Sequence, residues 1–131
     1  MKRLNIIIYN EATGRVFQNA ATLEDNVEAY LSEGQKFILG EANSDTHYVV
    51  DNGLAIRPIM PCLINKTSII ANNIDAAIIS NLPNPSTVYV DGQTLIVEDG
   101  TLSIKVGTIK KYPVRVMSFP YLDWEVTIHG T

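Results

Sequence analysis

The feature that most constrains this chain is the alternation of apolar and polar residues in its second half. From residue 86 to residue 129, apolar side chains recur at every second position of several short stretches, and Asp91-Gly92 and Asp99-Gly100 separate three of these stretches. Asp-Gly pairs favour the positive φ angles of tight hairpin turns, and a period of two places apolar side chains on one face of a strand. Because turns recur about every 8 to 12 residues, the pattern predicts an antiparallel β-meander in a small sandwich.

The same alternation predicts which side chains form the core of that sandwich. We expect them to be buried, with no helix across residues 86 to 128. The pattern of residues 69–82 is ambiguous, and the segment could hold one or two strands, such as Ser68 to Ala71 and Ala76 to Ile79. The predicted core residues are Val88, Val90, Leu95, Val97, Leu102, Ile104, Val106, Val114, Val116, Trp124, Val126 and Ile128.

The first 57 residues predict a smaller unit of hairpins. Residues 4–9 are apolar and β-branched, and a turn ending in Thr13-Gly14 leads into a returning strand over 15–18. Residues 36–39 have the composition of a third strand. Asn52-Gly53 lies between two apolar stretches, which indicates a second hairpin.

Thr22 to Gly34 carries the signals of a helix about three turns long. Thr22 is a residue type that caps a helix N-terminus, and Gly34 is a residue type that ends one. Four apolar residues fall at helical spacing on one face. They are Leu23, Val27, Tyr30 and Leu31.

Pro58 and Pro61 predict a boundary between two subdomains, because proline cannot donate a hydrogen bond to a sheet. We therefore expect a mainly β (α+β) protein. Residues 1–57 would form a small α+β hairpin-helix subdomain, and residues 58–131 an antiparallel immunoglobulin-like β-sandwich.

Composition excludes several classes of function. Of the 131 residues 46% are apolar, but no apolar run approaches the roughly 20 residues of a membrane helix, so we expect no membrane insertion. The apolar run after Lys2-Arg3 is too short for a signal peptide. A net charge of −4 argues against nucleic acid as a partner. The one cysteine excludes an intrachain disulfide and fits folding in a reducing compartment.

The residues capable of chemistry form no recognisable catalytic pattern. His47 and His129 are far apart and show no metal-ligand spacing, and Cys62 has no cationic neighbour to stabilise a thiolate. Phosphate-binding glycine loops and a GxSxG elbow are absent from the sequence. Asp123 and Glu125 flank Trp124, which would suit a sugar hydrolase only within a larger cleft. We therefore expect no enzyme activity, no catalytic or metal-ligating residues and no cofactor.

Three groups of stretches carry a family resemblance. They are Ile8 to Val16; Ile38 to Ala42 with Thr46 to Val49 and Asn52 to Pro58; and Leu82-Pro83 with Thr87 to Gly92, Tyr112 to Val116 and Phe119 to Asp123. Together they resemble small proteins encoded near the tail or tail-fibre genes of tailed bacteriophages, over most of the chain. The resemblance implies a virion structural protein of the tail tip, baseplate or fibre attachment. It also implies other tail proteins as partners, in several copies, with assembly in the host cytoplasm.

Two other functions stay open beside the structural one. A host-glycan-binding module needs exposed aromatic side chains with polar neighbours in a concave patch, and Tyr89, Tyr112 and Tyr121 could provide them. A tail-fibre assembly chaperone would be absent from the mature virion.

Residues 119–122 are the predicted partner-binding segment. Phe119, Tyr121 and Leu122 are large apolar residues around a proline, in a connection where polar residues are usual. A strand sends neighbouring side chains to opposite faces, so all three cannot enter one small core. Either Phe119 and Tyr121 seal the end of the sandwich, or at least one of the three side chains anchors a partner.

Cys62 generates the first testable prediction. Cys62→Ser should leave function intact and lower the free energy of unfolding by about 1 kcal/mol, because a buried hydroxyl loses hydrogen bonds to water. Denaturant melting measures the change in stability. A stoichiometric metal bound through His47 or His129 in the purified protein would contradict the expected absence of metal chemistry.

Overall fold

The computed structural model describes residues 2–131 and is mainly β. The chain divides into two compact units, the first ending at Pro58 and the second spanning Ile59–Thr131. The division lies one residue beyond the boundary expected from the sequence. Each unit has its own core and is described separately.

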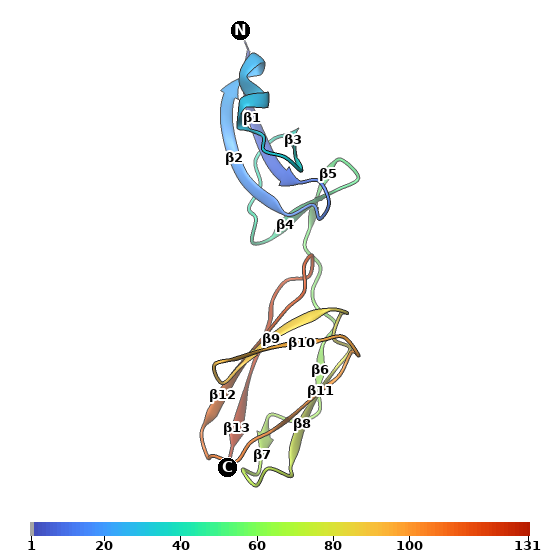
Figure 1. Cartoon of the computed structure of the whole chain (residues 1–131), viewed down its shortest axis with the longest axis vertical. Coiled ribbons are helices and arrows are strands. Elements are labelled where there is room, and N and C mark those ends of the chain that lie inside the picture. The colour runs from blue at the N-terminus through green and yellow to red at the C-terminus, as the bar shows by residue number, and fades with distance from the viewer. Residues whose placement is uncertain (1) are drawn as a thin grey trace. The chain divides into compact units, whose positions relative to one another are not determined.

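The first unit contains a three-stranded antiparallel sheet and a separate hairpin (Figure 1). The sheet order is β2-β1-β3, with β1 at Arg3–Asn10, β2 at Val16–Leu23 and β3 at Gln35–Leu39. The hairpin consists of β4 (His47–Val50) and β5 (Gly53–Ile56). Its turn residues are Asp51 and Asn52, both at positive φ, so the tight turn lies one residue earlier than the Asn-Gly pair indicated.

The central strand β1 is buried on both faces. Ile7 and Tyr9 pack into one cluster with Val16 and Val49, whereas Ile6 and Ile8 pack into a second cluster with Val27. A strand covered on both sides needs a continuous apolar run rather than an alternating one. This is why residues 6–9 show no polar position.

The predicted helix over Thr22 to Gly34 is wrong. Strand β2 continues to Leu23, and only Glu24–Tyr30 coil, as a 3₁₀ helix labelled η1. Thr22 is buried and paired with Leu4, and no side chain caps η1. Pairing along the whole of β1 outweighs the local capping signal. With three residues per turn, the predicted apolar stripe does not form, and only Val27 of η1 is buried.

The second unit is a sandwich of a five-stranded and a three-stranded sheet. Their orders are β10-β9-β12-β13-β7 and β11-β8-β6, and all pairings are antiparallel except β13 with β7. One core takes residues from both sheets. The immunoglobulin-like description stays a prediction. The strands are β6 (Leu63–Ile64), β7 (Ser68–Ile69), β8 (Ala76–Ser80), β9 (Ser86–Val90), β10 (Gln93–Val97), β11 (Leu102–Lys105), β12 (Lys111–Met117) and β13 (Trp124–Gly130).

The strands do not form a simple meander. Asp91-Gly92 joins the paired strands β9 and β10, as expected, but Asp99-Gly100 leads from β10 into β11 of the other sheet. The next strand, β12, then returns to pair with β9. Two sheets can share one core only if the chain crosses between them, so local turn chemistry does not identify which turns are hairpins.

Eleven of the twelve predicted core residues of the sandwich are buried or partly buried, and no helix interrupts residues 86–128. The exception is Leu95, which is 37% exposed. Its strand, β10, is the last of its sheet, so no strand covers its outer side. The alternation identified the face on which Leu95 lies but not its position at the sheet edge.

Gly14 and Gly34 provide a matched test of the first unit. Both have a φ of +80°, but a Cβ on Gly14 would overlap the carbonyl oxygen of Val49, whereas space is open at Gly34. We expect Gly34→Ala to lower the free energy of unfolding by about 1–2 kcal/mol through backbone strain alone. Gly14→Ala should cost about 3 kcal/mol or more, because steric overlap adds to that strain. Equal losses in denaturant melting would contradict the close approach of Gly14 to β4.

Candidate binding surface on the five-stranded sheet

The outer face of the five-stranded sheet presents a row of polar and aromatic side chains. The register sets Arg115 of β12 opposite Tyr89 of β9 on one side and Glu125 of β13 on the other. The neighbouring residues Val114 and Val116 are buried, and strand alternation therefore turns Arg115 outward. The pairings thus bring three side chains from separate stretches together on one surface.

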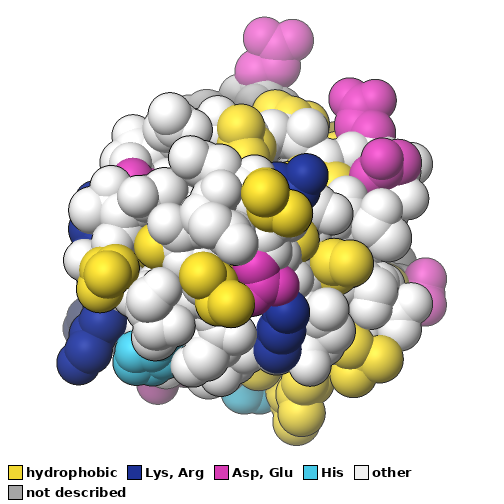
Figure 2. Space-filling model, turned by 90° about the horizontal axis from the view of Figure 1, so that it is seen from below, with side chains coloured by type: hydrophobic (Ala, Val, Ile, Leu, Met, Phe, Trp, Pro, Cys, Tyr) yellow, Lys and Arg dark blue, Asp and Glu magenta, His cyan; other side chains and the backbone are white. Residues whose placement is uncertain are grey.

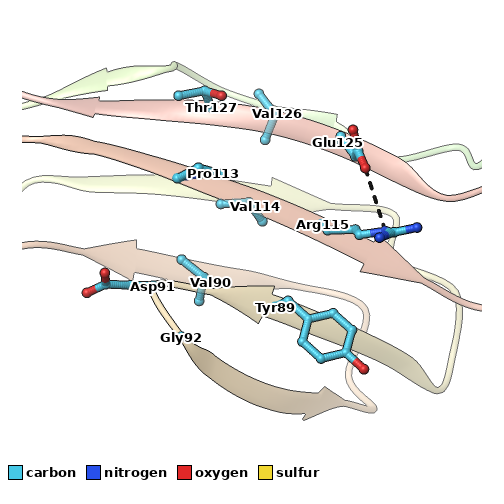
Figure 3. Close-up of a pocket in the computed structure, with 10 residues that line it drawn as sticks. All are labelled: Tyr89, Val90, Asp91, Gly92, Pro113, Val114, Arg115, Glu125, Val126 and Thr127. Carbon is cyan, nitrogen blue, oxygen red and sulfur yellow. Dashed lines mark ion pairs between the residues drawn. The ribbon is translucent and has the colours of Figure 1, made fainter.

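This face contains a shallow hollow of about 640 Å³. Figure 3 shows Tyr89, Arg115 and Glu125 at one end of it, on three adjacent strands. Asp91, Pro113 and Thr127 lie at the other end, with valines between the two groups. The lining residues are Tyr89, Val90, Asp91, Gly92, Pro113, Val114, Arg115, Glu125, Val126 and Thr127. We call this hollow the sheet-face site.

Two carboxylates hold the guanidinium of Arg115. Its Nη2 and Nε donate to Oδ2 of Asp123, at 2.6 and 3.1 Å, and Oε1 of Glu125 lies 3.6 Å from Nε. The hydrogen bond to Asp123, followed by the charges of Asp123 and Glu125, raises the pKa of Arg115. Asp123 and Glu125, weighed in the sequence as a hydrolase pair, thus have a common partner in Arg115.

A second ion pair involves Asp91, at the opposite end of the site. Nζ of Lys110 lies 2.7 Å from Oδ1 of Asp91, and the hydrogen bond to Asp91 raises the pKa of the lysine. The same ammonium lies 5.0 Å from the centre of the Tyr112 ring. Lys110 is therefore engaged within the protein.

The three tyrosines proposed for glycan contact differ in how exposed they are. Tyr89 is 42% exposed and lines the sheet-face site. Tyr112 is buried, and its hydroxyl donates to the carbonyl of Thr108. Tyr121 is half-buried and packs against the sandwich core. Of these three tyrosines, Tyr89 alone combines exposure with the polar neighbours that the sequence argument required.

The predicted partner-binding segment lies between β12 and β13. Phe119, Tyr121 and Leu122 are all half-buried. The packing of Tyr121 against the core agrees with a role in sealing the sandwich, although the residue stays partly exposed. Binding of a partner by these residues stays a prediction.

Arg115 was not singled out from the sequence. A lone arginine in an alternating strand is ordinarily a solvated residue. Glu125 lies on β13 and Asp123 directly precedes that strand, so their proximity to Arg115 depends on the register of β12 with β13. The only available signal was the shared outward phase of Arg115, Asp123 and Glu125.

Cys62, His47 and His129 are the other residues that the sequence analysis considered for catalysis or metal binding. Burial raises the pKa of the Cys62 thiol, which disfavours the reactive thiolate. His47 Nδ1 lies 2.7 Å from the Thr46 hydroxyl, and the backbone N–H of His129 donates to Thr67. Across residues 2–131, no group of three or more His, Cys, Asp or Glu side chains could hold a metal ion.

Exposed apolar side chains are scattered over the second unit. In the view of Figure 2 they lie at separate places among polar and charged groups. Single exposed apolar residues are normal on protein surfaces. Ile96 differs in position because it is 63% exposed and pairs with Thr87, next to the Thr94–Tyr89 pair. It therefore extends the aromatic and polar row toward the sheet edge.

Comparisons with known proteins identify no relative. No family model, no curated protein and no solved structure matches the chain. Within residues 2–131, no helix is long and apolar enough to cross a membrane. The function must therefore be argued from the resemblance in the sequence and from the geometry of the sheet-face site.

Tyr121→Ala tests the role of the predicted segment. Because Tyr121 is half-buried against the core, we expect the free energy of unfolding to fall by about 2 kcal/mol, less than the 3–5 kcal/mol of a fully buried aromatic. Denaturant melting measures the loss. An unchanged stability would contradict the sealing role and favour an anchor that acts only on a partner.

Proposed function

We propose that the protein is a non-enzymatic structural or adaptor component of a bacteriophage tail, at the tail tip, baseplate or fibre attachment. In this role it is held by other virion proteins through the sheet-face site. The resemblance of the sequence to small tail-associated proteins supports a location in the bacteriophage tail. The observation that carries the binding role is the exposed pair of Tyr89 and Arg115 on adjacent strands.

Tyrosine and arginine are among the residues that contribute most to protein–protein binding. Tyr89 offers a large ring at a low cost in conformational entropy. Arg115 is already held by Asp123 and Glu125, so little side-chain freedom is lost when a partner docks. The charged and polar groups beside Tyr89 match the polar rim of a typical interface.

The experiment compares Tyr89→Ala with Tyr30→Ala in particles of the phage that carries the gene. The two tyrosines are 42% and 43% exposed, but Tyr30 lies in η1 of the other unit. We expect Tyr89→Ala to reduce the copies per purified particle about tenfold or more, as for a loss of 2 kcal/mol at a binding hot spot. Tyr30→Ala should be incorporated normally.

Quantitative mass spectrometry of purified virions provides the readout. Melting of both variants shows whether either change acts through folding. Normal incorporation of Tyr89→Ala would remove the sheet-face site from the interface. Absence of the unaltered protein from finished particles would replace the structural role with that of an assembly chaperone.

The hollow shape of the sheet-face site also favours a second candidate, a host-glycan-binding module. Tyr89 provides an apolar ring beside groups that form hydrogen bonds, the arrangement that small-molecule sites require. A glycan array probed with the unaltered protein, Tyr89→Ala and Tyr30→Ala separates this role from the structural one. Binding that is lost only in Tyr89→Ala supports glycan recognition, and no binding by the unaltered protein excludes it.

A further inference from the structure

The outer side of β10 is an open sheet edge. β10 pairs with β9 and ends the five-stranded sheet, and no further strand pairs with it within residues 2–131. Its first four residues, Gln93 to Ile96, are all exposed. An open edge presents unpaired N–H and C=O groups that another strand can use.

The geometry of the turn before β10 determines which backbone N–H and C=O groups of β10 point away from β9. Asp91 and Gly92 have φ angles of 49° and 74°, which is the type I′ geometry of a two-residue hairpin. Val90 and Gln93 therefore exchange both backbone hydrogen bonds, and the bonded pairs recur at Leu95. The N–H and C=O of the intervening residues, Thr94 and Ile96, point away from β9.

β10 lacks the features that usually protect an edge. The other end strands of the second unit, β6 and β7, have two residues each, and β11 carries Lys105. In contrast, β10 has five residues without charge or proline, and its pairing with β9 contains no bulge. Short strands, lysine, proline and bulges are the devices by which proteins block unwanted pairing. A regular, uncharged and exposed edge is instead suited to accept a strand.

We propose that the edge of β10 binds an extended segment of another polypeptide as an added strand. The backbone groups of Thr94 and Ile96 would bond to this segment. Its apolar side chains would cover Leu95 on the inner face and Ile96 on the outer face, which are 37% and 63% exposed. This inference rests on the proposed function only in taking a protein as the partner, and it adds the mode of docking.

The charges around β10 indicate the chemistry of that segment. Glu98 and Asp99 follow the strand directly, whereas Asp91, before the strand, is already paired with Lys110. A segment with an uncharged centre and a lysine or arginine beside Glu98 and Asp99 complements this arrangement. A second copy of the chain supplies no such cation, because two-fold pairing about Leu95 would set Asp99 of one copy opposite Asp91 of the other, which is already engaged with its own Lys110.

Hydrogen exchange measured by NMR on the full chain tests the proposal. The probes are capped Thr-Val-Val-Val-Thr peptides, which present valine on both faces of an extended strand and are flanked by lysines or by glutamates. In the free protein, the amides of Thr94 and Ile96 should exchange rapidly, whereas that of Leu95 is protected by β9. The lysine-flanked peptide should slow exchange at Thr94 and Ile96 about tenfold or more, and the glutamate-flanked peptide should not.

A matched pair of proline variants tests the backbone contact. Ile96→Pro removes an outward N–H, whereas Ile109→Pro changes a residue that is 74% exposed in a bend outside the strands. The first should weaken peptide binding about tenfold, and the second should not. Melting curves identify any variant that is unfolded, and the exchange experiment on the unaltered protein does not depend on them.

Three results would overturn the proposal. They are unchanged exchange at Thr94 and Ile96 with the lysine-flanked peptide, equal protection by both peptides, and protection that appears in the protein alone as its concentration rises. The last result would identify a second copy as the occupant. None of these results bears on incorporation into virions, so a failure here is distinguishable from a failure of the proposed function.

Discussion

The second unit depends on the placement of β12 between β9 and β13. Val114 and Val116 are almost wholly buried, and they meet Val88 and Ile128 of the flanking strands in one core. A strand shifted by one residue would turn these valines to solvent, so burial strongly specifies the register. The same register places Arg115 between Tyr89 and Glu125 on the opposite face. The core therefore positions the sheet-face site without contributing to its chemistry.

Position in the sheet order accounts for the different character of the two candidate surfaces. Tyr89 and Arg115 lie on interior strands whose backbone groups are paired on both sides, so only their side chains can contact a partner. Thr94 and Ile96 lie on the last strand, where the backbone itself is available. The two surfaces are adjacent, because Thr94 pairs with Tyr89. One partner could thus contact side chains on the sheet face and backbone groups at its edge.

Short-range sequence signals in this chain predicted the structure correctly where long-range strand pairing did not compete with them. The hairpin turn at Asp91-Gly92 formed as expected because its φ requirements are met within the turn. The capping signal at Thr22 failed because β1 has an apolar run that needs a partner strand along its length, and Thr22 pairs with Leu4. Asp99-Gly100 turned the chain but did not make a hairpin, because the following strand belongs to the other sheet.

The sequence by itself determined the β class, most strand positions and the face on which each alternating side chain lies. These properties follow from the period of two and from the φ preferences of a few turn residues, which act over short distances. Only the tertiary structure decided that Arg115 meets Asp123 and Glu125, that Tyr89 is exposed while Tyr112 is buried, and that β10 ends its sheet. The order of strands is set by the packing of a whole core, and no local pattern in the chain encodes it.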